Sequence, residues 1–378
     1  MIPHAAFGNG MCQANRVSTL GKALSETSKD GETMKATRDD LDFDPSRLES
    51  FLARAFPGAG REMRIERISG GQSNPTYFVT FGQSRMVLRK KPAGAILQGA
   101  HAIEREFQVL KALENTDVPV PRPVLLCEDS EILDTPFYLM ERLDGRVFSD
   151  AALAELPREE RAPIYRAMAD ALASLHRVRP EEVGLSDYGR PGNYFERQIA
   201  RWTRQWRESS SPPIPDLDHL VEWLPSHVPP DDGAVSIAHG DFRLGNLMFH
   251  PTEPRVIAIL DWELSTLGHP LADLGFCCMP WHSSPQEYGG IVGLDHHALG
   301  LPSRDDFIAR YRESALSTSP LLPFHVVFAL FRFAVIFVGI ADRARAGNAA
   351  SDNASSMAPL AARFAARAVE ASVMADDL

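Results

Sequence analysis

The chain is poor in cysteine and has fewer basic than acidic residues. It contains only four cysteines in 378 residues, and none of them has the CxxC spacing of a metal or redox site. We therefore expect reduced, buried thiols in a cytoplasmic protein rather than a disulfide framework. The 39 basic and 50 acidic residues give a formal net charge of −11. That balance disfavours nucleic acid as a partner, because a phosphate backbone calls for clustered positive charge.

Long hydrophobic runs are also scarce. No apolar segment long enough for a signal peptide follows Met1. One membrane-like stretch, residues 321–341, contains His325 and Arg332 near its middle, and an arginine at the centre of a bilayer costs about 2.5–3.5 kcal/mol. We therefore expect a buried core helix and no membrane partner. No period of about 20–50 residues repeats, which argues against a solenoid.

The most informative stretch is residues 239–246, His-Gly-Asp-Phe-Arg-Leu-Gly-Asn. It places the carboxylate of Asp241 and the amide of Asn246 five residues apart on a predicted loop. Two strand-like segments follow within residues 247–260, separated by Pro-Thr-Glu-Pro, and Asp261 comes directly after the second. We expect this hairpin to bring the two carboxylates and the amide to one end of a small sheet.

Two carboxylates and an amide suit Mg²⁺-dependent phosphoryl transfer. Mg²⁺ takes hard oxygen ligands, commonly one or two protein groups together with phosphate oxygens and water. In kinases one Asp accepts the hydroxyl proton, and an Asn and a second Asp hold the metal. The alternative is a polar loop that caps a hairpin. The complete spacing favours Asp241 as the catalytic base, with Asn246 and Asp261 as metal ligands.

The segment resembles the catalytic loop of the aminoglycoside phosphotransferase and choline kinase-like family, which begins His-Gly-Asp. The resemblance covers residues 44–345, and the overall pattern is closest to kinase-like domains associated with acyl-CoA dehydrogenases. It implies an α+β, two-lobed, protein-kinase-like fold. Residues 41–145 would form a β-rich, nucleotide-binding N-lobe and residues 146–378 a mainly helical C-lobe, after an extension at residues 1–40 that we expect to be disordered.

A short glycine-containing loop at residues 69–75, Ser-Gly-Gly-Gln-Ser-Asn-Pro, lies between two predicted strands. Gly70 and Gly71 permit close backbone approach to a phosphate, and Ser73 and Asn74 can add contacts. A Gly-Gly hairpin turn is the commoner explanation of such a pattern. The family has a similarly short nucleotide loop, so the resemblance implies that these four residues bind ATP.

The predicted strand at residues 86–90 ends in Arg89 and Lys90, whose side chains lie on opposite faces. Either cation could meet the nucleotide phosphates. The resemblance favours Arg89, because choline kinase-like members carry an arginine at the end of a similar strand. On the helix predicted over residues 101–113, Glu106 lies near the centre of the apolar stripe, where a carboxylate needs a partner. We expect it to pair with the strand cation, as in the lysine–glutamate pair of kinases.

Further positions are candidates through the resemblance. It makes the backbone of Glu141 and Leu143 the hinge that meets adenine, and it makes Asp273 a support for the catalytic loop. Arg243 lies two residues past Asp241, where serine/threonine kinases carry a lysine near the transferred phosphate. It is therefore a candidate for stabilising the transition state, and an exposed loop arginine is the alternative.

The helix predicted over residues 193–206 combines apolar residues at helical spacing with several arginines. The apolar set is Phe195, Ile199, Trp202 and Trp206, and the basic set is Arg197, Arg201, Arg204 and Arg207. Aromatics with arginines could grip an acidic or phosphate-bearing acceptor. An amphipathic helix with a basic solvent face explains the pattern equally well.

These observations predict a kinase that uses ATP and Mg²⁺ to phosphorylate a hydroxyl of a small-molecule acceptor. An acidic or CoA-linked hydroxy acid is the preferred acceptor, because the overall pattern resembles domains associated with acyl-CoA dehydrogenases. The rival is a catalytically silent nucleotide-binding module of the same fold, and Mg²⁺-dependent turnover distinguishes the two. A metallophosphoesterase is disfavoured, because its expected second Asn-His motif is absent from the sequence.

Overall fold

The computed structural model describes most of the chain in two compact units. The described residues are 41–60, 62–68, 74–92, 102–190, 192–317, 319–345 and 354–376. Unit 1 extends to Val147 and includes Met248–Glu253 and Ile257–Glu263; unit 2 comprises Phe148–Leu247, Pro254–Val256 and the residues from Leu264 onward. The predicted extension at residues 1–40 lies outside the described residues.

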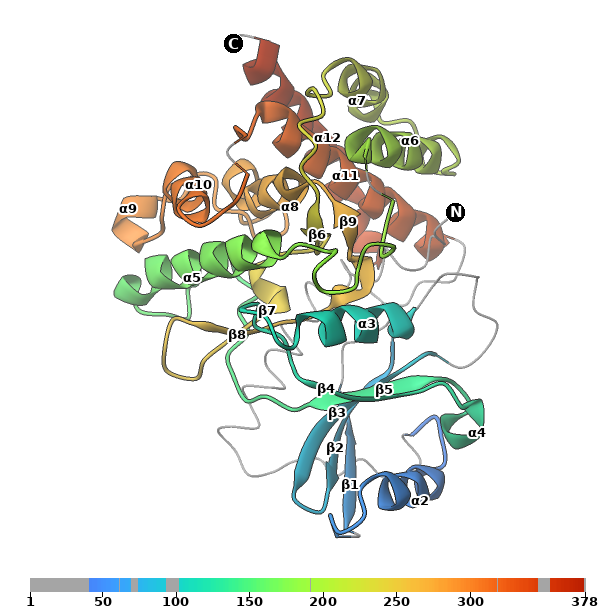
Figure 1. The fold of residues 1–378 in the computed structure, drawn as a ribbon. Coiled ribbons are helices and arrows are strands. Elements are labelled where there is room, and N and C mark those ends of the chain that lie inside the picture. Colours follow the sequence, from blue (N-terminus) through green and yellow to red (C-terminus); the bar gives the residue numbers. More distant parts are fainter. Residues whose placement is uncertain are drawn as a thin grey trace. The chain divides into compact units, whose positions relative to one another are not determined.

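Unit 1 is built on a five-stranded antiparallel sheet (Figure 1). Its strands are β1 (Met63–Arg67), β2 (Thr76–Phe81), β3 (Ser84–Lys90), β4 (Pro123–Cys127) and β5 (Phe137–Glu141), in the order β1-β2-β3-β5-β4. The strands predicted on either side of residues 69–75 are present as β1 and β2, and the strand predicted at residues 86–90 is β3, which begins two residues earlier. Alternation along β3 sends Leu88 to one face of the sheet and Arg89 to the other.

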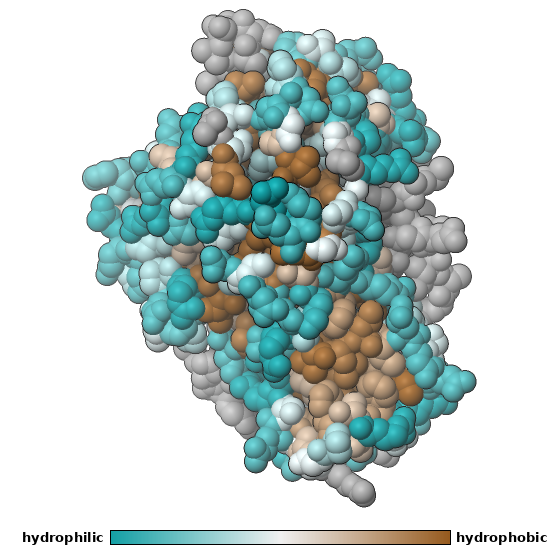
Figure 2. Space-filling view, viewed as in Figure 1, coloured by the Kyte–Doolittle hydropathy of each residue, from teal (hydrophilic) through white to brown (hydrophobic). Residues whose placement is uncertain are grey.

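The two faces of this sheet are covered differently. Helix α2 (Pro45–Ala55), capped by the Asp44 side chain, packs on the Leu88 face over a large hydrophobic core. Helix α3 (Ile103–Leu113) lies on the other face, where Val87 packs with Ile68 and Phe78 in a separate hydrophobic cluster. Figure 2 shows hydrophobic residues gathered over the sheet on the drawn face of unit 1, with mostly hydrophilic residues around them.

Unit 2 is mainly helical. Its helices are α5 (Arg158–Arg177), α6 (Tyr194–Arg207), α7 (Pro215–Ser226), α8 (Pro270–Cys277), α9 (His296–Leu299), α10 (Arg304–Arg312), α11 (Pro323–Arg345) and α12 (Ala354–Asp376). Helix α11 packs against α12, α8, α6 and α7. It is long and apolar enough to cross a membrane, but every residue from Phe324 to Ala341 is buried within unit 2. The predicted core helix is confirmed.

Short strands frame the His-Gly-Asp segment. β6 (Ser236–Ala238) pairs with β9 (Thr266–Gly268), and β7 (Leu247–Phe249) pairs with β8 (Val256–Ile259) as the predicted hairpin. The sequence did not reveal β6 and β9, because three residues are too few to display a period of two. Helix α7 was also missed, since prolines stand at its first turn and near its end.

Candidate active site

Unit 2 carries the segment that contains the predicted base, between β6 and β7. Gly240 has φ +82°, a left-handed conformation that favours glycine. A Cβ atom at this position would lie 2.9 Å from the carbonyl oxygen of Leu264. The glycine of the His-Gly-Asp motif is therefore required by both the turn and the close approach of the neighbouring backbone.

Asp273 fixes the start of this loop. Its carboxylate accepts hydrogen bonds from the backbone N–H of His239 at 2.7 Å and of Gly240 at 2.9 Å. On the other side, the Arg332 guanidinium donates to the carbonyl of Gly240. Burial acts to raise the pKa of Asp273, but the His176 side chain, 3.4 Å away, and the loop N–H groups outweigh it, so the pKa lies below its usual value. Asp273 thus supports the loop as an ionised carboxylate.

Asp241 is held by the two other functional side chains of the loop. The Asn246 side-chain N–H₂ donates to the Asp241 carbonyl at 2.8 Å and to its Oδ2 atom at 2.7 Å. The Arg243 Nε–H donates to the same Oδ2 at 3.3 Å. Because the amide nitrogen of Asn246 makes both bonds, its amide oxygen is the atom that could ligate a metal ion. The predicted base, amide and arginine are therefore adjacent.

Unit 1 gathers three carboxylates around Arg89. The Arg89 guanidinium lies 3.0 Å from Glu106, 2.9 Å from Asp261 and 3.8 Å from Glu263. Its side chain is 13% exposed. Burial acts to lower the pKa of Arg89, but the charges of Glu106 and Asp261 raise it well above its ordinary value. The predicted cation, its helix partner and one predicted metal ligand thus form one ion cluster.

Glu106 has two further partners. The Asn74 amide donates to its Oε1 atom at 2.8 Å, and the Tyr138 hydroxyl donates to its Oε2 atom at 3.0 Å. Burial raises the pKa of Glu106 and outweighs the lowering effect of Arg89. Tyr138 was not among the predicted site residues, although it lies opposite Arg89 in the register of β5 and β3. Correct strand pairing would have revealed it.

Asp261 follows β8 in a strained backbone conformation. Its φ is +65°, which a residue with a side chain seldom adopts. The end of β8 is tied down by a 2.8 Å hydrogen bond from the N–H of Ile259 to the carbonyl of Pro119. Such strain persists where the surroundings impose it, commonly at functional sites. Glu263, which the sequence reasoning also missed as a site residue, lies two positions further along the same turn.

Lys90, the alternative cation, lies on the opposite face of the sheet. It is fully buried, and its Nζ atom is 3.1 Å from Asp42. Glu104, the other carboxylate in the first turn of α3, pairs with Lys91 at 2.5 Å. Of these two cations and two carboxylates, only Arg89 and Glu106 therefore meet among the described residues.

The predicted adenine and phosphate contacts are described in part. Gly70, Gly71 and Ser73 lie outside the described residues. The Glu141 N–H already donates to the carbonyl of Arg122 at 2.9 Å, so only its carbonyl remains a hinge candidate. Leu143 follows β5 and is partly buried.

Helix α6 shows both features that its sequence suggested. Its apolar residues Phe195, Ile199, Trp202 and Trp206 are buried, and Arg204 and Arg207 are exposed. Arg201 is different, because its guanidinium lies 4.9 Å from the centre of the Trp202 ring. The Arg332 guanidinium lies 5.7 Å from the same ring. The guanidinium groups of Arg201 in α6 and Arg332 in α11 therefore both lie near the Trp202 ring.

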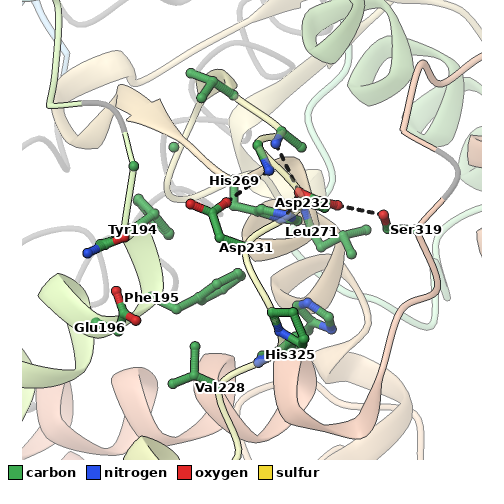
Figure 3. A pocket seen from close by; sticks show the side chains of 18 of the residues that line it. Tyr194, Phe195, Glu196, Val228, Asp231, Asp232, His269, Leu271, Ser319 and His325 are labelled. Carbon is green, nitrogen blue, oxygen red and sulfur yellow. Dashed lines mark hydrogen bonds and ion pairs between the residues drawn. The ribbon is translucent and has the colours of Figure 1, made fainter.

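Unit 2 also contains a cavity of about 390 Å³ beside β9 and the start of α8 (Figure 3). The Ser319 hydroxyl donates to Asp232 at 2.5 Å, and the His269 Nε2 atom lies 3.1 Å from the same carboxylate. Since the carboxylate is central and accepts both bonds, these residues do not form a nucleophile–base relay. In the described part of the chain, no residue predicted for catalysis or nucleotide binding lines this cavity.

The family comparison matches most of both units. The sequence model described as the phosphotransferase enzyme family matches residues 64–307. Among curated proteins, the chain is 43% identical over 330 residues to probable acyl-CoA dehydrogenase IBR3 of Arabidopsis thaliana, covering 82% of this chain and 40% of that protein. It is 39% identical over 319 residues to human acyl-CoA dehydrogenase family member 11, covering 82% and 41%. The chain thus spans less than half the length of these relatives.

Solved structures give the same architecture. A crystal structure of an aminoglycoside phosphotransferase-like protein from Ralstonia eutropha has a TM-score of 0.80 at 44% identity, covering 88% of this chain and 99% of that chain. Aminoglycoside phosphotransferase APH(4)-Ia, in a ternary complex with AMP-PNP and hygromycin B, has a TM-score of 0.56 at 15% identity, covering 86% and 98%. The predicted α+β, protein-kinase-like fold is confirmed.

Proposed function

Because the chain belongs to the phosphotransferase enzyme family, we propose that it transfers the terminal phosphoryl group of ATP to a hydroxyl of a small molecule. The observation that carries the proposal is the geometry of Asp241. Its carboxylate is fixed by Asn246, on a loop that Asp273 pins at two successive N–H groups. A general base needs such a fixed carboxylate within reach of a proton.

The residues present fit Mg²⁺ and ATP. Asn246 and Asp261 offer the hard oxygen atoms that Mg²⁺ prefers. Within the described residues no group of three His, Cys, Asp or Glu has metal-binding geometry, so the remaining ligands would be phosphate oxygens and water. The buried Oδ1 atom of Asn74 has no hydrogen-bond partner among the described residues, which suits a site completed by a ligand. Bound Mg²⁺ would offset the charge that develops on the transferred phosphoryl group.

Each protein group then has one task. Asp241 orients the acceptor hydroxyl and takes its proton late in the transfer, and Arg243 stabilises the charge of the phosphoryl group. Arg89, oriented by Glu106, binds the nucleotide phosphates together with Gly70, Gly71, Ser73 and Asn74. The backbones of Glu141 and Leu143 would meet the adenine. We assign these roles because the residues occupy the positions of the family motifs.

An acidic or CoA-linked hydroxy acid remains the preferred acceptor. The relatives at 39–43% identity carry acyl-CoA dehydrogenase names, which associates this kind of domain with acyl-CoA compounds. The proposal includes a cytoplasmic location, which the buried free thiols of Cys127, Cys277 and Cys278 support.

Mg²⁺-dependent ATP consumption over a panel of acceptors tests this function. The panel contains hydroxyacyl-CoAs, hydroxy acids, amino alcohols, sugars and aminoglycosides. We expect turnover with one class, and an Asp241→Ala variant should lose about 10²- to 10⁴-fold in kcat while it still binds Mg·ATP. Asp305→Ala, which removes an exposed carboxylate, is the matched control. Binding of Mg·ATP without turnover on any acceptor would instead favour the silent nucleotide-binding module.

A further inference from the structure

Arg332 is a buried cation that contacts the catalytic loop. It lies in the middle of α11, a long and largely apolar helix of unit 2, and the residue is only 6% exposed. Its guanidinium donates to the carbonyl of Gly240, the residue immediately before Asp241. A charged group at such a position needs a strong local reason, because desolvation of an ion is expensive.

The surroundings of Arg332 supply no compensating carboxylate. Among the described residues, no Asp or Glu oxygen lies within 4.0 Å of its guanidinium nitrogens. Its other neighbours are the rings of Trp202 at 5.7 Å and Phe276 at 5.6 Å. Its buried Nε atom has no hydrogen-bond partner in the part of the chain that the structure describes. One carbonyl and two aromatic faces therefore leave most of its charge uncompensated.

A second arginine adds positive charge to the surroundings of Arg332. Arg201 of α6 shares the Trp202 ring with Arg332. Burial and the positive charge of Arg332 together lower the pKa of Arg201 to about 9. The two guanidinium groups therefore repel each other. A buried cation and a partly buried one are stabilised when an anion comes between or beside them.

We infer that Arg332, with Arg201 beside it, binds an oxyanion of the phosphoryl acceptor and thereby selects hydroxyl compounds that carry a carboxylate or phosphate. The inference rests on the proposed function, which it deepens by naming the charge of the substrate and the residues that recognise it. A guanidinium has five N–H donors in a planar fork that matches the geometry of both oxyanions. Arg332 uses one of them on the loop.

Because Arg332 contacts the residue before Asp241, the bound anion and the reacting hydroxyl would lie close together. Gly240 and Asp241 are consecutive, with Cα atoms about 3.8 Å apart, so one small molecule is long enough to place an oxyanion on Arg332 and a hydroxyl on Asp241. Arg332 would then be a specificity residue, and Asp241 the base. The competing explanation is purely structural: Arg332 would only hold the Gly240 carbonyl. In that case its loss would damage every acceptor equally.

Binding of matched probes separates these explanations. The anionic probes are 3-hydroxybutyrate, which carries a carboxylate, and 3-hydroxybutyryl-CoA, which carries phosphates. The uncharged probes are 1,3-butanediol and 3-hydroxybutyryl-pantetheine. Calorimetry measures their Kd for the full chain with Mg²⁺ and AMP-PNP, in the wild type and in Arg332→Gln, Arg332→Lys and Arg201→Gln. Arg204→Gln is the control, because Arg204 is an exposed arginine of the same helix.

We expect the wild type to bind one anionic probe at least about 10-fold more tightly than its uncharged match. Arg332→Gln should raise that Kd about 10- to 100-fold, as expected for loss of a charge-assisted contact, and should change the Kd of the uncharged match less than about twofold. Arg332→Lys and Arg201→Gln should have intermediate effects, and Arg204→Gln none. Which anionic probe responds identifies carboxylate or phosphate as the recognised group.

Two results would overturn the inference. One is a wild type that binds charged and uncharged probes equally; the other is an Arg332→Gln variant that weakens both kinds to the same extent. If Arg332→Gln does not fold, Arg201→Gln provides the same comparison on α6. Failure of the proposed function has a different signature: the probes bind with the expected charge preference, but none becomes phosphorylated from Mg·ATP.

Discussion

Arg89 in unit 1 and Arg332 in unit 2 are both mostly buried arginines, but their surroundings are opposite. Arg89 lies within 4.0 Å of three carboxylates, Glu106, Asp261 and Glu263. Arg332 meets a carbonyl and two aromatic rings. The first arrangement already carries excess negative charge, and the second carries excess positive charge.

This difference indicates whether each region favours an added cation or an added anion. A site with three carboxylates and one guanidinium favours an added cation, which agrees with the role proposed for Asp261 as a ligand of Mg²⁺. A site with two guanidinium groups favours an added anion. We therefore expect changes near Arg89 to affect nucleotide binding and the stability of unit 1, and changes near Arg332 to affect the acceptor.

Replacing Arg89 with methionine should have the largest effect on stability. The change keeps a similar shape but leaves Glu106 and its carboxylate neighbours without their common cation. Loss of one partner from a buried ion pair costs about 3–5 kcal/mol, and we expect that decrease in the free energy of unfolding together with weaker Mg·ATP binding. Urea denaturation and calorimetry with Mg·ATP measure the two effects.

Arg85→Met on the same strand is the matched control. Arg85 pairs with Asp144 on the surface, with side chains 47% and 61% exposed. Such exposed pairs contribute about 0–1 kcal/mol, so this variant should remain close to the wild type. Equal stability of the Arg89→Met and Arg85→Met variants would contradict this prediction, since it would mean that Arg89 does not stabilise its carboxylates.

The Asp273→Asn variant tests the support of the catalytic loop in unit 2. An amide can no longer accept from both N–H groups as an ionised carboxylate does, so we expect a loss of about 1.5–3 kcal/mol in the free energy of unfolding. The value of kcat should fall more than the KM for ATP, because the change displaces Asp241. Asp170→Asn, at a half-exposed pair with Arg310, is the control and should affect neither quantity appreciably. A stable Asp273→Asn variant with unchanged kcat would show that Asp273 does not support the loop.

A smaller effect on stability should come from His325, which, unlike Arg332, can lose its proton and become neutral. Burial lowers the pKa of His325 to about 4, below the value of about 6.5 in an unfolded chain. The unfolded chain therefore takes up the proton first, and stability falls as the pH drops from about 6.5 toward 4. We expect a loss on the order of 1–2 kcal/mol between about pH 7 and 5.

A His325→Asn variant should remove that part of the pH dependence, and urea denaturation at both pH values measures it. His219→Asn, at an exposed position on α7, should leave the dependence unchanged. An unchanged dependence in His325→Asn would show that other groups, such as His269 or Asp232 beside it, dominate the titration of this region.

Local patterns were sufficient to predict many of these features. The period of α3 placed Glu106 on the apolar stripe and predicted its pairing with the strand cation, and the spacing around Asp241 and Asn246 predicted their proximity. The glycine of His-Gly-Asp and the support by Asp273 followed from the family resemblance. Each of these inferences concerns residues within one element or one motif.

Contacts between distant elements could not be predicted in this way. The partners of Arg332 come from α6, α8 and the catalytic loop, and no period in α11 indicates them. Within the sequence, Arg332 only interrupts a hydrophobic run. Tyr138 and Glu263 were missed for a related reason, because strand register and a tight turn bring them to Arg89 and Glu106.

Helix α11 also determines how this protein should behave when it denatures. Its residues Phe324–Ala341 are buried in the folded state and are apolar except for His325 and Arg332. Once unit 2 opens, that stretch meets water and can associate with the same stretch of another molecule. Heating should therefore produce aggregates and scan-rate-dependent transitions. Solubility after heat shock would reflect the lifetime of the folded unit rather than its equilibrium stability.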